Sequence, residues 1–299
     1  MQKVKNTIPV YDICSLSGAG HLHEEIIAER FAAYLQVHPN LYRAHGHSFY
    51  HLVLFTKGGG FHTIDFRRYP VVAGQMYFMV PGQVHSWDFE GEIDGYVVNF
   101  SETLFSGFLA DNRYLEQFSF LSGNAPEPII QLNDTELIPA AGLLNEVVEE
   151  HAQAQPFSRD LLRLKLLSLF ILVGRTAGTA ATGTDAAHPR LLVLHNFRKL
   201  VNQYYSQYKL PKDYAAMLYV TPNHLNAVCQ DLLGKSAGEV IRERILLEAK
   251  RLLVNADTGI ADIGYRLGFT DNSYFTKFFK KYAGTTPEAF RRDLQVPSS

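Results

Sequence analysis

The sequence predicts an α+β protein with an N-terminal antiparallel β-barrel, a helical segment behind it and a C-terminal all-α domain. Three observations predict this organisation. Residues 41–101 hold short aromatic and β-branched runs separated by glycine- and proline-containing turns. Residues 135–173 carry apolar residues at helical spacing. Residues 213–234 and 259–284 each read as two short helices joined by a tight turn.

The charge is unevenly divided along the 299-residue chain, although the net charge is only −2. From Ala186 to the C-terminus there are 16 Lys and Arg against 10 Asp and Glu, so the preceding part has 12 against 20. The length suffices for two or three domains with substantial cores. An acidic first part and a basic last part indicate a small ligand or protein partner for the first and a polyanion for the second.

Cysteine usage and hydropathy indicate the cellular compartment. Cys14 and Cys229 are far apart and fit no metal or redox spacing, which favours free thiols in a reducing cytoplasm. The most apolar run, residues 161–173, is interrupted by Arg163 and Lys165 and is too short to span a bilayer, and the N-terminus does not resemble a signal peptide. We therefore expect a cytoplasmic protein without a membrane partner.

Residues 1–130 form the first expected domain, which contains the strand-like runs HLVLFT, FHTIDF, YFMV and YVVNF. Regular strand and turn spacing without intervening helices favours an antiparallel sandwich or barrel. His45, His47 and His51 have the same parity, so on one continuous strand all three would point to the same face. His85 follows the turn PGQVH.

This segment, residues 43–101, resembles the cupin barrel. The first cupin motif places His-x-His and then Glu on one strand, and the second supplies another His after a Pro-Gly turn. His45 and His47 match the first motif and His85 the second, but His51 stands where the Glu belongs. Four imidazoles suit zinc, copper, iron or nickel. The alternative is that these histidines line the barrel mouth and hydrogen-bond to one another, to a ligand or to the backbone. We expect the second arrangement, with no bound metal and no cofactor.

Residues 131–176 form the expected helical segment, with one helix over 135–151 and another over 158–173. The end of the second helix, LLSLFILVG, is apolar on nearly every face, so it must be buried. Packing against the barrel and a two-helix dimer interface both explain it. Residues 177–188 are small and polar, which predicts a flexible linker.

Residues 189–299 form the expected all-α domain, and its second helix-turn-helix unit lies at residues 259–284. Gly268 ends the first helix there, and Thr270 is expected to cap the second. The first unit, residues 213–234, has Thr221 as a cap and Pro222 at the first helical position. The two units align as an internal repeat, with Leu225 against Phe275. A helix over 237–255 separates them and is expected to hold both recognition helices against successive major grooves of DNA.

Residues 190–292 resemble the AraC/XylS family of bacterial transcription regulators. The resemblance rests on RILLEAKRLL, on the block IADIGYRLGFTDNSYFTKFFKKYAGTTPEAFRR and on TPNHLNAVC of the first unit. The family implies two helix-turn-helix units that bind DNA, often behind a cupin-like sensor that binds an effector and dimerises. The first unit departs from the family at Asn223 and Ala227, where basic residues are frequent.

The expected DNA contacts are polar or basic residues on the outward faces of the two units. Amides can pair with adenine, and lysine can reach guanine or phosphate. The DNA-binding set is Asn223, His224, Asn226, Gln230, Lys235, Arg251, Asn272, Ser273, Thr276, Lys277, Lys280 and Lys281. The effector-binding set is Arg43, His45, His47, His51, His85 and Trp87.

Two classes of function follow from these residues. In the first, the chain is not an enzyme: it is a homodimeric regulator that binds an operator in double-stranded DNA and a small polar effector such as a sugar, and that contacts RNA polymerase if it activates transcription. In the second, the four barrel histidines belong to a metal-dependent cupin enzyme with a regulatory DNA-binding tail. The chain contains no nucleophile and base at a convincing spacing, which favours the first class.

Overall fold

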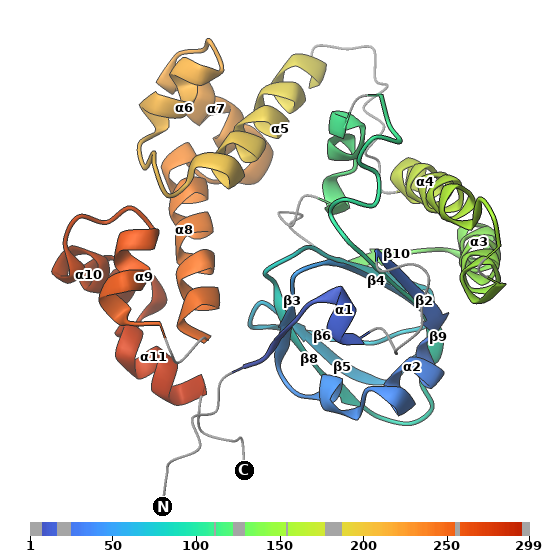
Figure 1. Cartoon of the computed structure of the whole chain (residues 1–299). Coiled ribbons are helices and arrows are strands. Elements are labelled where there is room, and N and C mark those ends of the chain that lie inside the picture. The colour runs from blue at the N-terminus through green and yellow to red at the C-terminus, as the bar shows by residue number, and fades with distance from the viewer. Residues whose placement is uncertain are drawn as a thin grey trace, which may run out of the picture. The chain divides into compact units, whose positions relative to one another are not determined.

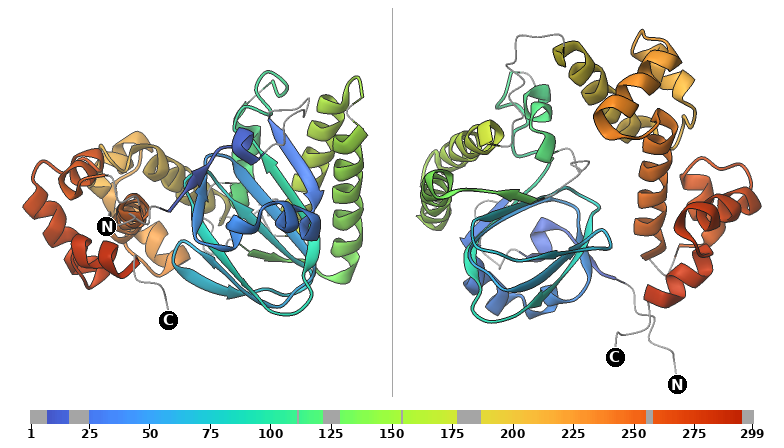
Figure 2. Two further views of the ribbon diagram at one scale, coloured as in Figure 1. Left: turned by 60° about the horizontal axis from the view of Figure 1, so that its bottom comes forward. Right: turned by 180° about the vertical axis from the view of Figure 1, so that it is seen from behind.

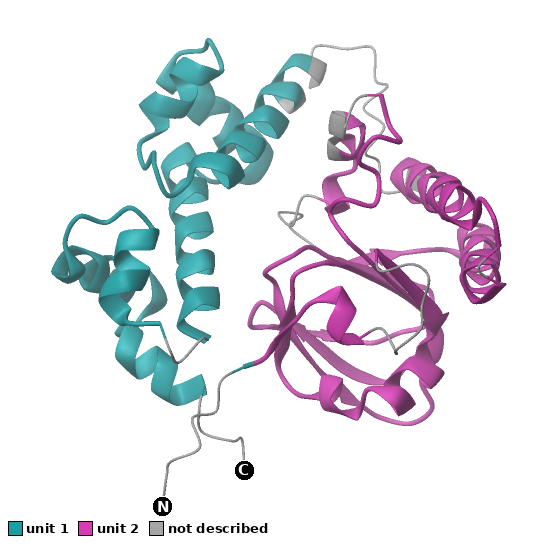
Figure 3. Ribbon diagram, in the orientation of Figure 1, with its two compact units in different colours: residues 1–8, 182–299 teal, residues 9–181 magenta. Residues whose placement is uncertain are grey.

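The computed structural model describes residues 8–16, 25–110, 112–121, 129–153, 155–176, 187–254 and 258–294. The chain divides into two compact units, one of residues 9–181 and one of residues 1–8 and 182–299 (Figure 3). The expected linker, residues 177–188, lies outside the described residues except for its last two. None of the helices within these ranges combines the length and the apolar character needed to cross a membrane.

Two five-stranded sheets form the unit of residues 9–181 (Figure 1). The first contains, in spatial order, β1 (Val10–Tyr11), β3 (His45–His47), β8 (Val84–Phe89), β5 (Gly60–Ile64) and β6 (Arg67–Pro70). The second contains β10 (Ile129–Gln131), β7 (Gln75–Met79), β4 (Tyr50–Lys57), β9 (Asp94–Phe100) and β2 (Ile26–Arg30). The pairs are antiparallel except β1 with β3. The expected fold is confirmed as a barrel-like sandwich, with one parallel pair that the sequence did not indicate.

Short helices connect several of these strands. They are α1 (Ile13–Leu16), α2 (Phe31–Val37) and the 3₁₀ helices η1 (Pro39–Tyr42), η2 (Asn112–Gln117) and η3 (Ser119–Leu121). Phe31 and Tyr34 of α2 are buried among interior side chains of the sandwich.

The second sheet is buried on both faces, which explains why its strands read as continuous apolar runs. On β4, Leu52 and Leu54 belong to one core cluster, whereas Val53 and Phe55 belong to another. Successive side chains of a strand point to opposite faces, so the first pair faces the helices and the second pair faces the interior. His51 has the parity of the interior pair.

Helices α3 (Asp134–Gln153) and α4 (Ser158–Thr176) pack against each other and against the outer face of the second sheet (Figure 2). Phe170 of α4 is fully buried, and its ring centroid lies 6.3 Å from that of Phe78 and 5.9 Å from that of Phe100. The apolar end of α4 is therefore buried against the sheet. This is the first of the two explanations that the sequence allowed.

The other unit is all-α, as expected. It contains α5 (Ala187–Tyr204), α6 (Pro211–Met217), α7 (Pro222–Leu233), α8 (Ala237–Val254), α9 (Ile260–Arg266), α10 (Asn272–Ala283) and α11 (Pro287–Leu294). The pair α6 and α7 lies at one end of α8, and the pair α9 and α10 lies toward the other (Figures 1 and 2). Each pair is a helix-turn-helix unit.

The caps of the two recognition helices differ. At the start of α7, the Thr221 hydroxyl accepts from the His224 backbone N–H at 3.1 Å, as expected. At the start of α10, the Asp271 carboxylate accepts from the Ser273 N–H at 2.5 Å, so the expected cap at Thr270 is wrong. The second turn is one residue longer, which moves the cap by one position.

One continuous core joins the two helix-turn-helix units. It contains Leu225 and Val228 of α7, Phe275 and Phe279 of α10, and the inner face of α8. The α8 residues in it include Ile241, Ile245, Ala249 and Leu253, all at most 1% exposed. Burial of these apolar surfaces fixes both recognition helices to one central helix.

Candidate functional site

The outward face of α10 is polar and basic. Asn272, Ser273 and Lys277 are exposed, Thr276 is half-buried, and Lys280 and Lys281 are exposed in the last turn. Within the described part of the chain, none of these three lysines pairs with a carboxylate. Their charges are therefore available to a polyanion such as the DNA backbone.

The outward face of α7 carries uncharged polar groups. Asn223, His224 and Gln230 are exposed. Asn226 is also exposed, but its Oδ1 accepts from the Ala237 N–H at 2.9 Å and so connects α7 to the start of α8. A bidentate contact to adenine uses both the oxygen and the nitrogen of an amide. Asn226 therefore supports the fold of the unit through this oxygen, and its contact with DNA stays a prediction.

Two basic residues are engaged with carboxylates. The Arg251 side chain is 8% exposed, and its Nη1 lies 3.6 Å from Glu248 Oε2. Burial and this ion pair keep Arg251 from reaching phosphate, so the expected contact is corrected. Lys235 is more exposed, and its Nζ lies 2.7 Å from Glu243 Oε1. An exposed pair of this kind is weak, so Lys235 can exchange it for phosphate.

In the sandwich, the four predicted histidines converge from three strands. His45 and His47 lie on β3, His51 on β4 and His85 on β8, and all four are at most 2% exposed. The expectation of one continuous strand is wrong, because β3 and β4 are separate strands in different sheets. The side chains still meet, because both strands face the interior between the sheets.

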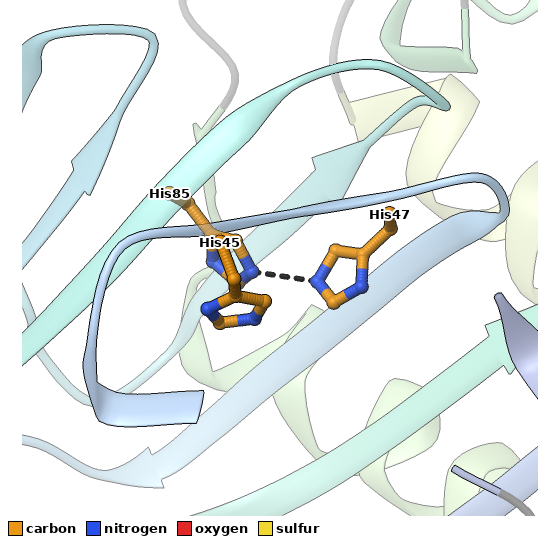
Figure 4. Close-up of side chains that lie close together, drawn as sticks. All are labelled: His45, His47 and His85. Carbon is orange, nitrogen blue, oxygen red and sulfur yellow. Dashed lines mark hydrogen bonds between the residues drawn. The ribbon is translucent and has the colours of Figure 1, made fainter. Parts of the chain in front are cut away.

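The closest contact in this cluster joins two imidazole nitrogens. His47 Nε2 lies 2.6 Å from His85 Nε2 (Figure 4). The ring of His45 lies beside that of His85, with centroids 4.2 Å apart. The ring of His51 stacks on that of His47, with centroids 4.9 Å apart. One nitrogen from each of His45, His47 and His85 lies within 4.8 Å of the other two.

Three further residues belong to this site and were not predicted. His62 Nε2 lies 2.9 Å from His85 Nδ1. Asn99 Oδ1 lies 2.6 Å from His51 Nδ1, and its Nδ2 donates to the Tyr34 hydroxyl at 3.0 Å. The alternation of side chains along the strands could have indicated two of them. His62 lies two residues before buried Ile64 on β5, and Asn99 lies two residues after buried Val97 on β9, so each points to the same side as its buried neighbour.

Burial keeps these imidazoles neutral near pH 7. It lowers the pKa of His45 to about 4 and that of His51 to about 4. The pKa values of His47, His62 and His85 are also well below the ordinary value, first because of burial and then because of neighbouring imidazoles. Neutral imidazole is the form that accepts hydrogen bonds and binds metals.

Several of these nitrogens lack a hydrogen-bond partner. Among the residues that the structure describes, His45 Nε2, His51 Nε2, His47 Nδ1 and His62 Nδ1 are buried and unpaired. Buried polar groups are nearly always satisfied, so these nitrogens are available to a ligand, an ion or water. The cluster can therefore hydrogen-bond to a small polar molecule or bind a transition metal.

The remaining two predicted effector residues have other surroundings. Trp87 is 6% exposed, and its ring stacks on His62 with centroids 3.4 Å apart. It is therefore a wall of the histidine cluster. Arg43 is exposed, and its backbone carbonyl accepts from His45 Nδ1 at 2.7 Å. Arg43 thus has a main-chain role beside the cluster, and the effector contact of its side chain stays a prediction.

Comparisons with known proteins match both units. Residues 31–169 match the model of an AraC-like ligand binding domain, and residues 214–293 match that of a helix-turn-helix domain. The HTH-type transcriptional activator RhaR of Mannheimia succiniciproducens is 21% identical over 251 residues, which are 83% of this chain and 86% of that protein. The probable transcription factor PqrA of Proteus vulgaris is 40% identical over 76 residues, 25% of this chain and 62% of that protein.

Among solved structures, ToxT from Vibrio cholerae O395 is similar, with a TM-score of 0.42 and 14% identity over 92% of this chain and 100% of that one. The ligand-binding domain match covers the sandwich with the histidine cluster. The helix-turn-helix domain match covers the two helix-turn-helix pairs that α8 joins. The chain therefore belongs to the AraC family of DNA-binding transcription regulators, with an AraC-like ligand-binding domain before its helix-turn-helix domain.

Proposed function

We propose that this regulator binds its operator through α7 and α10 together, and that a small polar molecule such as a sugar controls it from the sandwich. The observation that carries the proposal is the continuous core through α8. Helix α8 has 18 residues, so it is about 27 Å long. One turn of B-DNA is about 34 Å, so two recognition helices held on α8 suit successive major grooves.

The two recognition helices contribute differently. Helix α10 supplies Lys277, Lys280 and Lys281, which pair with no carboxylate among the described residues, and their charges support phosphate contacts and affinity. Helix α7 presents uncharged groups, which support base selectivity. The proposed contact residues are Asn223, His224, Gln230, Lys235, Asn272, Ser273, Thr276, Lys277, Lys280 and Lys281.

The proposed effector site is the histidine cluster, because its neutral buried nitrogens can accept hydrogen bonds from hydroxyl groups. A small polar effector would satisfy nitrogens that are otherwise unpaired. The histidines serve binding rather than catalysis in this proposal, so the chain is not an enzyme. A DNA operator also supports a cytoplasmic location.

Homodimerisation is proposed through α4 or the sandwich. Leu161 and Leu164 of α4 are 42% and 49% exposed, on the face that does not pack against the sheet. Exposed leucines on one helix support an apolar contact with a second copy. The RhaR relatives are named transcriptional activators, which supports an RNA polymerase contact if this chain also activates transcription.

Selection of duplexes from a random DNA pool by the full-length protein tests the operator proposal. We expect a motif of two elements about one helical turn apart. In a gel shift on the selected duplex, Lys277→Ala should weaken binding about 5- to 150-fold, which corresponds to about 1 to 3 kcal/mol for one good contact. The matched control is Lys57→Ala in the sandwich, where Lys57 pairs with Glu92 at 3.0 Å. A selection that enriches no motif contradicts the proposal.

A thermal-shift screen of small polar metabolites on the full-length chain tests the effector site. A stabilising compound should lose its effect in the His45→Ala, His47→Ala double variant. If the compound still raises the melting temperature of that variant by the full amount, the effector does not bind at the histidine cluster.

A further inference from the structure

We propose that the histidine cluster binds one first-row transition-metal dication, with His45, His47 and His85 as ligands and His51 completing the set. This inference departs from the expectation of a metal-free chain and concerns the same nitrogens as the proposed effector site, which a metal would bind in place of hydroxyl groups. It rests on hydrogen bonds, distances and burial inside the sandwich, and it does not depend on DNA binding.

The hydrogen bonds of two histidines leave their Nε2 atoms ready to bind a metal. His45 Nδ1 lies 2.7 Å from the Arg43 carbonyl oxygen, which can only accept, so Nδ1 carries the proton of the neutral ring. His51 Nδ1 faces Asn99 Oδ1 at 2.6 Å, and the Asn99 amide nitrogen donates to Tyr34. Both Nε2 atoms therefore carry lone pairs. Each is buried, with no partner among the described residues.

These partners are the kind that orient metal-binding histidines. A ligating imidazole usually donates its second N–H to a carbonyl, a carboxylate or water, which fixes the ring and its tautomer. Arg43 supplies a main-chain carbonyl to His45, and Asn99 supplies a side-chain carbonyl to His51. Both rings lie beside His47 and His85, with ring centroids 4.2 to 5.2 Å apart.

His47 and His85 need only a small adjustment. Their Nε2 atoms are 2.6 Å apart, so one ring donates its proton to the other. Zinc binds imidazole nitrogen at about 2.0 to 2.1 Å, so two ligands of a tetrahedral site lie about 3.3 Å apart. One nitrogen each from His45, His47 and His85 already lies within 4.8 Å of the others. Small side-chain rotations would bring the three ligating nitrogens to the spacing of about 3.3 Å that a tetrahedral site requires.

Metal binding requires a change of tautomer but no net loss of a proton from the pair. Without metal, one of the two rings donates its Nε2 proton to the other. When the metal binds, that proton moves to Nδ1 of the same ring, and both Nε2 lone pairs then point to the metal. On His85 the Nδ1 proton is received by His62 Nε2, 2.9 Å away. His62 stacks on Trp87 and thus acts as a support for His85 rather than as a ligand.

The donor set indicates the class of metal. Imidazole nitrogens suit Zn²⁺, Cu²⁺, Fe²⁺ and Ni²⁺, whereas Mg²⁺ and Ca²⁺ prefer oxygen ligands. Each buried polar group without a partner destabilises a fold. A bound metal would satisfy the Nε2 atoms of His45 and His51 at once. We choose Zn²⁺ and Co²⁺ as probes, because both accept a tetrahedral nitrogen set and Co²⁺ is visible by absorption.

The test uses the full-length protein, treated with a chelator and then dialysed free of it. Titration with Zn²⁺ or Co²⁺ alone should show one metal per chain by elemental analysis, a tetrahedral Co²⁺ absorption spectrum and a rise in melting temperature. His85→Gln should abolish binding at stoichiometric metal. His51→Gln should weaken binding and change the Co²⁺ spectrum, since one nitrogen is replaced. His62→Gln should weaken it about 10- to 100-fold, as expected for a supporting residue.

The matched control is His195→Gln, which removes a half-buried histidine of α5 that belongs to neither proposed site and should leave metal binding unchanged. Near-UV circular dichroism of each metal-free variant checks the fold, and His45→Gln provides the ligand test if His85→Gln unfolds. Absence of saturable binding for both ions overturns the proposal, as does unchanged affinity in a folded His45→Gln, His85→Gln double variant. Operator binding measured on the same samples reports separately on the proposed function.

Discussion

Tyr219 and Gly268 occupy the same place in the two helix-turn-helix units, directly after the C-caps Leu218 and Leu267, and both have a left-handed backbone. Their φ angles are 56° and 73°. Glycine adopts this conformation readily, whereas a side chain with a Cβ does so at a cost of about 1 to 2 kcal/mol. Tyr219 is 96% exposed, so packing offsets little of this strain.

Tyr219→Gly should therefore stabilise the helical unit. We expect the free energy of unfolding to rise by about 0.5 to 1 kcal/mol in urea denaturation, after the larger chain entropy of glycine is included. The contrasting variant is Gly268→Ala, which should destabilise the unit, because its Cβ would lie 1.8 Å from the Ser206 carbonyl oxygen. A loss of stability in Tyr219→Gly would mean that the tyrosine ring makes a stabilising contact.

Phe275→Ala should destabilise both helix-turn-helix units together. Phe275 is fully buried, with its ring centroid 5.3 Å from that of Phe269, and removal of such a ring costs about 3 to 5 kcal/mol. Because one core runs through α8, we expect a single unfolding transition at lower denaturant. Tyr274→Ala, at a neighbouring residue that is 61% exposed, should cost less than about 1 kcal/mol. Two separate transitions in Phe275→Ala would show that the units unfold independently.

The lysines of α10 should control the salt dependence of operator binding. Each phosphate contact contributes about 0.9 to the slope of log affinity against log salt. Alanine at Lys277, Lys280 and Lys281 together should lower this slope by about 2 to 3. The control pair, Asn223→Ala and Gln230→Ala on α7, should change affinity and leave the slope nearly constant. An equal change of slope in both sets would refute the proposed division between the two helices.

The two cysteines should differ strongly in thiol reactivity. Burial raises the pKa of Cys229 to about 11, so at pH 8 only about one molecule in a thousand carries the reactive thiolate. That fraction rises about tenfold for each unit of pH below the pKa. Cys14 is exposed. A disulfide reagent at pH 8 should therefore modify one thiol rapidly in the native chain and two in denaturant. Rapid modification of native Cys14→Ser would contradict the burial of Cys229.

The elements that the sequence predicted well depend on neighbouring residues along the chain. Thr221 and Pro222 begin α7 because a side-chain cap and a fixed φ act within one turn. The cap of α10 was misplaced because Thr270 and Asp271 are both good caps, and the length of the preceding turn decides between them. Apolar spacing likewise located α4, but the burial of Phe170 against Phe100 needed the fold.

The candidate sites were predicted where periodicity or a short motif suffices. The exposed face of α10 follows from the buried positions of Phe275 and Phe279. Arg251 was placed wrongly, because its ion pair with Glu248 and its burial depend on how α8 packs. The hydrogen bond of Asn226 was not predicted for a similar reason, since its partner Ala237 belongs to the next helix.

The two repeated helical units, the strand-rich first part and the inward parity of the histidines were predictable from the sequence, because each depends on the spacing of residues within one element. The contacts of His51 with Asn99 and of His62 with His85 were not, because they depend on the tertiary fold. These contacts join different strands, and their geometry follows from the pairing of the strands and from how the two sheets face each other. Such long-range relationships are set by the burial of the whole sandwich, which no local pattern records.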